Sequence, residues 1–221
     1  MKGLSVVIPT LDAAATLSAC LEAIAGCAVI VADGGSGDAT IAIAERGGAR
    51  VVRADRGRGP QLIAGAALAP SDWLLFLHAD TVLEAGWRAE VGTFVAEADN
   101  AKRAAVFAFA LDDGSPQARR LERLVRWRGR ALGLPYGDQG LLIHRRLYDA
   151  IGGYRPLAIM EDVDLVRRIG QARLVELDTR AVTNGKRWRR EGWLRRSGRN
   201  IGCLALYFAG VPSRYLVRLY G

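Results

Sequence analysis

The sequence WLLFLHAD at 73–80 places two candidate metal ligands, His78 and Asp80, directly after a short apolar run. Such a run predicts a strand buried in a parallel sheet, and open α/β sheets bind ligands beyond the carboxyl ends of their strands. Because His78 and Asp80 are two residues apart, both side chains can face one ion. Mg²⁺ and Mn²⁺ prefer oxygen ligands, so Asp80 is the first candidate and His78 the second. The alternative is a strand end with a helix-capping aspartate and a surface histidine.

An acidic pair, Glu161 and Asp162, stands at the start of a helix predicted over 162–169. The helix dipole stabilises an anion at this end, and an ionised aspartate in a cleft is a suitable general base for an acceptor hydroxyl. Asp162 and Glu161 are therefore candidate catalytic residues. The alternative is the charged first turn that many helices have.

Two further motifs carry groups suited to a nucleotide. VADGGS at 31–36 follows a predicted strand, where Asp33 could accept hydrogen bonds from a base or ribose and the glycines let a ligand approach the backbone. RGRGPQ at 56–61 opens a predicted helix, where Arg58 and free backbone N–H groups could hold a phosphate. The alternatives are a βα turn capped by Asp33 and a solvated basic turn. Because the chain has no GxGxxG and no Walker A motif, dinucleotide-binding and P-loop functions are disfavoured.

The segments that must position these groups alternate between strands and helices in the first part of the chain. Apolar runs predict strands over 4–8, 28–32, 49–54 and 73–77. Helical periodicity predicts helices over 14–25, 40–46 and 60–68, the second capped by Asp38. This alternation predicts an α/β fold with a parallel sheet and helices on both faces. The strand ends then carry a set of side chains to one edge, the predicted nucleotide crevice: Thr10, Asp12, Asp33 and Asp80.

The second part of the chain alternates less regularly and is more basic. It is predicted to contain helices over 87–98, 117–132 and 162–169 and strands over 104–110 and 141–144, with no element assigned after Gly185. The arginine-rich helix over 117–132 indicates a surface helix packed on the sheet or a helix lying on an anionic membrane. KRWRR at 186–190, with Trp193, has three interpretations: a solvated helical face, a surface for donor or membrane phosphate, and a nucleic-acid patch.

Size, charge and cysteine content set broader limits. The 221 residues suffice for one domain with a sizeable core, and the 50% hydrophobic content excludes a disordered chain. The net charge of +8 favours anionic partners such as phosphates, nucleic acid or an acidic membrane. Three cysteines without a CxxC pair indicate a reducing, cytoplasmic compartment. No secretory signal is expected, and the apolar run over 201–211 is about half the length of a membrane span. Peripheral membrane contact remains open.

Together these motifs resemble the family 2 inverting glycosyltransferases of the GT-A fold over nearly the whole chain. The resemblance rests on LSVVIPT at 4–10, VADGGS at 31–36, WLLFLHAD at 73–80, GGY at 152–154 followed by the Glu161–Asp162 pair, and NGKRW at 184–188, similar to a QxxRW element. RGR at 56–58, LFLHADT at 75–81, YGDQG at 136–140, MED at 160–162 and GVP at 210–212 resemble a small radical-SAM-associated subfamily labelled arsenosugar-biosynthesis glycosyltransferase.

The resemblance implies one GT-A domain with a mixed, mostly parallel sheet. Its nucleotide-sugar-binding, Rossmann-like half would span 1–81, its acceptor and catalytic half 82–185, and a basic aromatic segment 186–221. The implied donor is a nucleoside diphosphate sugar, with a UDP-hexose favoured, and the implied cofactor is Mn²⁺ or Mg²⁺. On the donor side, Asp80 and His78 would bind the metal and Arg58 would lie near the diphosphate. The nucleotide pocket would be lined by Pro9, Thr10, Asp12 and Asp33.

On the acceptor side, the resemblance implies that Asp162, beside Glu161, deprotonates an acceptor hydroxyl. A single in-line displacement then inverts the anomeric carbon, and no enzyme nucleophile is required. The acceptor would be a small molecule or a lipid-linked group, and no nucleic-acid partner is expected. The sequence does not indicate the oligomeric state. The implied acceptor-side residues are Gly137, Asp138, Gln139, Arg187 and Trp188.

Three departures from the family pattern bear on these roles. His78 stands in place of the first aspartate of a DxD motif, Gly34 in place of a common second aspartate, and Asn184 in place of glutamine. Two other functions compete. A nucleic-acid-binding protein would use the Arg/Trp-rich end of the chain. A sugar-phosphate nucleotidyltransferase would need a basic glycine-rich loop after the first strand, but PTLDA at 9–13 has no basic residue.

Overall fold

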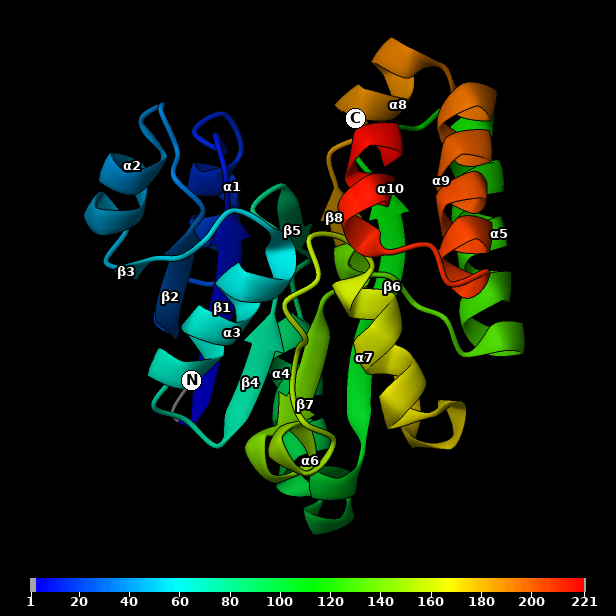
Figure 1. Cartoon of the computed structure of the whole chain (residues 1–221). Helices are drawn as coiled ribbons and strands as arrows, with labels where there is room; N and C mark the ends of the chain where they lie inside the picture. Colours follow the sequence, from blue (N-terminus) through cyan, green and yellow to red (C-terminus); the bar gives the residue numbers. More distant parts are fainter. Residues whose placement is uncertain (1–2, 221) are drawn as a thin grey trace.

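The computed structural model describes residues 3–220, and one eight-stranded sheet forms the middle of this region (Figure 1). Its strand order is β3-β2-β1-β4-β7-β6-β8-β5. β1 to β4 pair in parallel, β7 is antiparallel to β4 and β6, and β8 is parallel to β6 but antiparallel to β5. The predicted mixed, mostly parallel sheet is therefore confirmed. The strands are β1 (Leu4–Thr10), β2 (Ala28–Asp33), β3 (Arg50–Arg53), β4 (Trp73–Phe76), β5 (Thr81–Leu83), β6 (Ala104–Leu111), β7 (Leu141–His144) and β8 (Leu174–Thr183).

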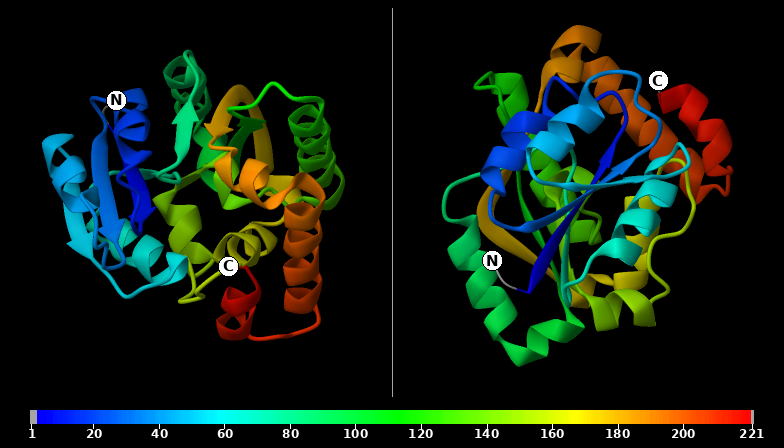
Figure 2. Two further views of the ribbon diagram at one scale, coloured as in Figure 1. Left: turned by 90° about the horizontal axis from the view of Figure 1, so that it is seen from above. Right: turned by 90° about the vertical axis from the view of Figure 1, so that its left-hand side faces the viewer.

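Helices cover both faces of this sheet (Figure 2). Successive strand residues point to opposite faces, so Val6 of β1 packs in one core with α1, α2 and α4, and Val7 packs in a second core with α3, α6 and α7. Both valines are fully buried, which explains the continuous apolar run of β1. The helices are α1 (Leu17–Ala23), α2 (Thr40–Arg46), α3 (Arg58–Leu68), α4 (Trp87–Ala96), α5 (Pro116–Leu132), α6 (Arg145–Ala150), α7 (Glu161–Ile169), α8 (Lys186–Glu191), α9 (Trp193–Phe208) and α10 (Ser213–Tyr220), with short 3₁₀ turns η1 (Ala98–Lys102), η2 (Gly137–Gln139) and η3 (Gln171–Arg173).

The first half of the chain matches its predicted elements closely. β1 and β2 each extend beyond the predicted strand, to Thr10 and Asp33, and these two end residues face each other across the ladder. The helix predicted over 14–25 is shorter, because only Leu17–Ala23 is helical. Asp38 precedes the N-cap position of α2, but its Oδ1 still accepts a hydrogen bond from the backbone N–H of Thr40 at 2.9 Å.

The second half contains elements that the sequence pattern missed. β8 has only scattered buried positions and includes exposed Asp178, so no apolar run marked it as a strand. The helices α8 to α10 were also unassigned. α10 folds back against α9 and reaches the start of α3, where the Tyr220 ring centre lies 5.8 Å from the Arg58 guanidinium carbon. Within residues 3–220, no helix is both long enough and apolar enough to span a membrane.

Candidate active site

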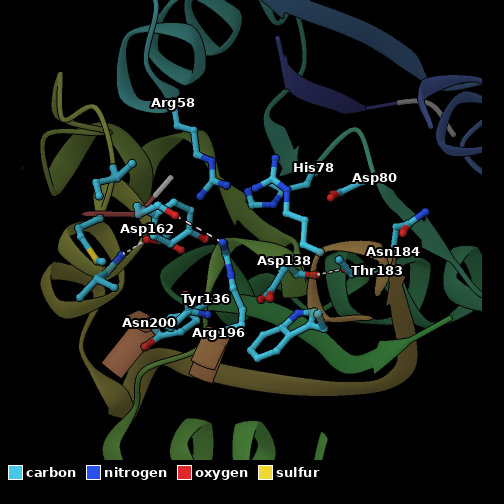
Figure 3. A pocket seen from close by; sticks show the side chains of 16 residues that line it. Arg58, His78, Asp80, Tyr136, Asp138, Asp162, Thr183, Asn184, Arg196 and Asn200 are labelled. Atoms are coloured by element: carbon cyan, nitrogen blue, oxygen red, sulfur yellow. Dashed lines mark hydrogen bonds between the residues drawn. The ribbon is translucent and has the colours of Figure 1, made fainter. Parts of the chain in front are cut away.

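Two adjoining pockets lie beside the carboxyl ends of β1 and β4. They share the side chains of Arg58, His78, Asp80, Asn184 and Arg187. The strand-edge pocket is further lined by Pro9, Thr10, Leu11, Asp12, Ala13, Ala15, Thr16, Gln61, Ala79, Lys186 and Arg190. The inner pocket (Figure 3) is further lined by Tyr136, Asp138, Ile159, Met160, Asp162, Val163, Thr183, Trp188, Arg196, Asn200 and Tyr220. Two pockets with a common wall suit the transfer of a group between two bound molecules.

The loop after β1 lines the strand-edge pocket as predicted, with Pro9, Thr10 and Asp12 among its residues. Asp33 does not. It is fully buried, and its carboxylate accepts hydrogen bonds from the Thr10 hydroxyl at 3.0 Å and from the backbone N–H groups of Gly35 and Ser36 at 2.9 and 2.8 Å. Although burial opposes ionisation, these hydrogen bonds lower the pKa of Asp33. The geometry supports the alternative interpretation, in which Asp33 shapes the turn and does not contact a ligand.

A buried glutamine occupies the space beside Gly34. The Nε2 of Gln61 donates hydrogen bonds to the backbone carbonyls of Thr10 and Ala32, at 2.5 and 3.0 Å. A Cβ at Gly34 would lie 2.9 Å from this nitrogen, so any larger residue there would displace Gln61. Gly34 stands where a second aspartate is common, and the side chain of Gln61 from α3 fills the space beside it and links β1 to β2. The sequence analysis did not single out Gln61, because only the fold brings it to Gly34.

His78 and Asp80 lie in the wall common to both pockets. Burial, together with the positive charges of Arg58 and Arg187, lowers the pKa of His78 to about 3, so its imidazole is neutral and has a free nitrogen lone pair. No residue within 3–220 donates a hydrogen bond to the Asp80 carboxylate, and no cluster of three or more His, Cys, Asp or Glu side chains forms a complete cation site there. One carboxylate and one neutral imidazole fit an ion that takes its remaining ligands from phosphates and water.

Arg58 opens α3, and its side chain reaches both pockets. The predicted participation of free N–H groups at this helix end is wrong. The backbone N–H groups of Arg58 and Gly59 donate to the carbonyls of Ala158 and Leu157, at 3.4 and 3.0 Å. Burial disfavours the guanidinium charge, but Tyr220 and the nearby carboxylates outweigh it and raise the pKa of Arg58. Arg58 can therefore meet an anion with its side chain alone.

Asp162 is positioned by two backbone N–H groups. Its Oδ2 accepts a hydrogen bond from Gly137 at 2.7 Å, and its Oδ1 accepts one from Val163 at 2.7 Å. A Cβ at Gly137 would lie 2.8 Å from Nε2 of His78 and 3.3 Å from Oδ2 of Asp162. A glycine at this position therefore lets the candidate base and the candidate metal ligand approach each other. This convergence joins segments that are far apart in the sequence.

Glu161 lies behind Asp162 and lines neither pocket. Its side chain is fully buried, and both carboxylate oxygens lack a hydrogen-bond partner within residues 3–220. Burial, and then the charge of Asp162, raise the pKa of Glu161 to about 8 against the opposing effect of Arg58. A neutral, enclosed carboxyl cannot take a proton from a substrate. The geometry thus supports Asp162 and not Glu161 as the base.

Of the predicted acceptor-side residues, Asp138, Arg187 and Trp188 line the inner pocket. Burial, and secondarily the charges of Asp162 and Asp80, raise the pKa of Asp138 to about 6 against the effects of Arg128 and Arg58. Gln139 does not reach the pocket. It is buried, and its Nε2 donates to the carbonyl of Phe107 at 3.1 Å.

Several residues of the inner pocket were not predicted. Tyr136 stacks under the Arg128 guanidinium, whose carbon lies 3.3 Å from the ring centre. Asn200 has a buried side-chain oxygen without a partner in the described part of the chain. Arg196 is only 4% exposed and lies 4.5 Å from the Tyr220 ring centre. Asn200 and Arg196 come from α9 and Tyr220 from α10, and no local sequence signal shows which face of such helices turns inward.

Comparisons with known proteins bear on the family and the fold. Residues 5–155 match the protein family described as glycosyl transferase family 2. A PGL/p-HBAD biosynthesis glycosyltransferase of Mycobacterium tuberculosis is 40% identical over 106 residues, which cover 42% of this chain and 41% of that protein. The match therefore spans less than half of the curated relative.

Two solved structures have a similar fold. S. aureus TarS 1-349 in complex with UDP-GlcNAc has a TM-score of 0.61 and 17% identity, over 81% of this chain and 58% of that TarS chain. Mycobacterium tuberculosis glucosyl-3-phosphoglycerate synthase, with Mn²⁺, UDP and glucosyl-3-phosphoglycerate, has a TM-score of 0.57 and 22% identity, over 81% of this chain and 70% of the synthase. At these identities the likeness concerns the fold. The narrower radical-SAM-associated subfamily stays a prediction.

Proposed function

Because the chain belongs to glycosyl transferase family 2, we propose that it transfers a sugar from UDP to an acceptor hydroxyl with inversion, and that it depends on Mn²⁺ or Mg²⁺. The chain is a glycosyltransferase that takes its sugar from a nucleotide sugar. One observation carries the finer proposal: Gly137 holds Asp162 of the inner pocket close to His78, which lies with Asp80 in the wall shared by the two pockets. That arrangement supports a base on the acceptor side of the reaction and a metal-binding group on the donor side.

The strand-edge pocket would hold the donor nucleotide. Pro9, Thr10 and Asp12 line it next to Asp80, and Arg58 reaches it from α3. Asp80, with His78 as a second ligand, would hold the cation, which offsets negative charge on the departing diphosphate. The side chains of Arg58 and Arg187 would contact the same phosphates, since guanidinium groups bind phosphate through paired N–H donors. UDP and Mn²⁺ bound in the fold neighbour of 22% identity support this choice of donor.

The inner pocket would hold the acceptor. Its wall combines carboxylates, the indole of Trp188, and polar groups from α9. Asp162 would accept the proton of the attacking hydroxyl through a lone pair left free by its two backbone hydrogen bonds. The hydroxyl oxygen then forms a bond to the anomeric carbon while the bond from that carbon to the UDP oxygen breaks on the opposite side. A single displacement of this kind inverts the anomeric configuration. The acceptor is proposed to be a small molecule or a lipid-linked hydroxyl.

Calorimetric binding of UDP, GDP, CDP and TDP, each with Mn²⁺ or with EDTA, tests the donor site. We expect UDP to bind in the presence of Mn²⁺ and the Asp80→Ala variant to lose this metal-dependent binding. The exposed Asp99 provides a matched control, because Asp99→Ala removes a carboxylate far from both pockets and should leave UDP binding unchanged. Absence of binding by every diphosphate would contradict the proposal, and equal Mn²⁺ dependence in Asp80→Ala would move the metal site elsewhere.

A further inference from the structure

One side of the molecule carries all the large apolar side chains that are exposed within residues 3–220. They lie on α5, α9 and α10, which gather on one side of the fold (Figures 1 and 2). Large apolar patches on a protein surface mark contacts with membranes or other proteins. The side chains are Leu124, Trp127 and Leu132 of α5, Leu194, Ile201, Leu206 and Phe208 of α9, and Tyr215, Val217 and Leu219 of α10. We call this set the apolar face.

An ordinary surface helix turns its apolar stripe inward, but α9 turns a second apolar stripe outward. Leu194, Ile201 and Phe208 recur every seven residues and so share one side of the helix, where they are 90%, 59% and 47% exposed. The charged Arg196, in contrast, points inward and is 4% exposed, and Asn200 lines the inner pocket. An outward apolar stripe of this kind is stabilised when an apolar surface covers it and removes its side chains from water.

Positive charge is concentrated on the same side. The chain has 31 basic and 23 acidic residues. Residues 186–221 contain nine of the basic residues and one of the acidic residues, so residues 1–185 contain 22 of each kind. The final segment therefore accounts for the whole net charge of +8. Exposed Arg195 of α9, Arg218 of α10 and Arg120 of α5 form no ion pair with any residue within 3–220.

We propose that the apolar face, with its exposed arginines, docks on an anionic lipid bilayer. Helices that lie in the plane of a membrane insert apolar side chains below the headgroups, while arginines contact lipid phosphates. A second copy of the chain is a poor occupant, because it would bring the same positive segment against itself. The inner side of α9 lines the inner pocket, so docking places that pocket next to the lipid surface. This inference stands apart from the proposed reaction.

Co-sedimentation of the full chain with lipid vesicles tests the proposal. Wild type should bind vesicles that mix phosphatidylcholine with phosphatidylglycerol, should bind phosphatidylcholine alone much more weakly, and should be released by salt. The double variant Leu194→Gln/Ile201→Gln should bind the mixed vesicles at least about tenfold more weakly, since two apolar side chains no longer enter the bilayer. Arg195→Gln/Arg218→Gln should also weaken binding, by about fivefold for each arginine.

The matched control is Arg46→Gln/Arg50→Gln, which removes two exposed charges from the opposite side, at α2 and β3 (Figure 1). It should bind vesicles like wild type. All three double variants change exposed residues outside both pockets, so their unfolding temperatures and UDP affinities should match wild type. Vesicle binding can therefore be lost while UDP binding is kept, and UDP binding can be lost while vesicle binding is kept.

Three results would overturn the proposal. One is the absence of binding to the anionic vesicles. Another is an equal loss of binding in the Arg46/Arg50 control and the Arg195/Arg218 variant, which would show attraction by net charge alone. The third is concentration-dependent self-association in ultracentrifugation that Leu194→Gln/Ile201→Gln abolishes, without vesicle binding, which would make the apolar face an interface between copies.

Discussion

The strand edge and the C-terminal helices both supply side chains to the candidate active site, but they do so in opposite ways. At the strand edge, Thr10 and Asp80 stand at or just beyond the ends of buried strands. On the other side, Arg196 and Asn200 come from α9, a helix that turns Leu194, Ile201 and Phe208 outward. Side chains at the ends of parallel strands are gathered by the sheet itself, whereas a helix needs tertiary packing to decide which face turns inward. In the proposed reaction the strand edge serves the donor and the helices serve the acceptor.

Asp162→Asn should have the largest effect, because it removes the proposed general base. With a UDP-sugar that wild type uses as donor, the rate of UDP release should fall by roughly 10²–10⁴-fold, the usual contribution of a general base. UDP affinity should stay near wild type, since Asp162 lies in the inner pocket and not in the strand-edge pocket. Turnover close to wild type would remove Asp162 from the mechanism and break the proposed division of roles.

Gly137→Ala should disturb the same junction indirectly. The new Cβ would lie 2.8 Å from Nε2 of His78, so either the imidazole or the backbone that holds Asp162 must move. A misplacement on the order of 1 Å costs about 10²-fold in rate, and turnover should fall toward that level. Gly92→Ala is the matched control, because nothing lies within 4 Å of a Cβ at that position of α4. Equal turnover in the two variants would show that the approach of Gly137 to His78 is unimportant.

Arg58→Gln and Asn200→Ala test the division between donor and acceptor sides directly. Removing the guanidinium should weaken UDP binding by about tenfold or more, as expected for a hydrogen bond to a charged group. Asn200 lines only the inner pocket, so Asn200→Ala should leave the UDP dissociation constant unchanged. Both constants are measurable by calorimetry with Mn²⁺ present. A loss of UDP affinity in Asn200→Ala would mean that the two pockets do not separate the substrates.

Glu161→Gln should change the pH dependence of stability and have the smallest effect. The pKa of Glu161 is raised from 4.5 to about 8 in the folded chain, so between these values the folded state binds more protons than the unfolded state. This difference destabilises the fold as pH rises through that range, by up to about 1.4 kcal/mol per pH unit. The variant has no such group, and its stability relative to wild type should grow from pH 5 to pH 8 in urea unfolding. A constant difference would contradict a neutral Glu161.

The strand edge of the candidate site was largely predictable from local patterns. The strands β1 and β4 are buried on both faces, so each appears in the sequence as a continuous apolar run. The end of that run shows where the strand ends and which residues follow it. Asp80 and Asp162 were singled out because a carboxylate beyond a strand end meets the ligand-binding edge of the sheet, and one at a helix start is stabilised as an anion. At Asp33 the motif shows a carboxylate after a strand, but not that Thr10 and the next turn satisfy both of its oxygens.

The sequence by itself determined the strand and helix order from β1 to β4, the α/β class and the carboxylates at the strand edge, because hydrophobic periodicity and strand ends are local properties. Only the tertiary structure decided that Gly137 brings Asp162 to His78, that Gln61 fills the space at Gly34, and that Arg196 turns inward while Leu194 turns outward. These relations join residues distant in the chain, or depend on which side of a helix meets its neighbours. A linear pattern specifies the faces of a helix, and packing decides where each face points.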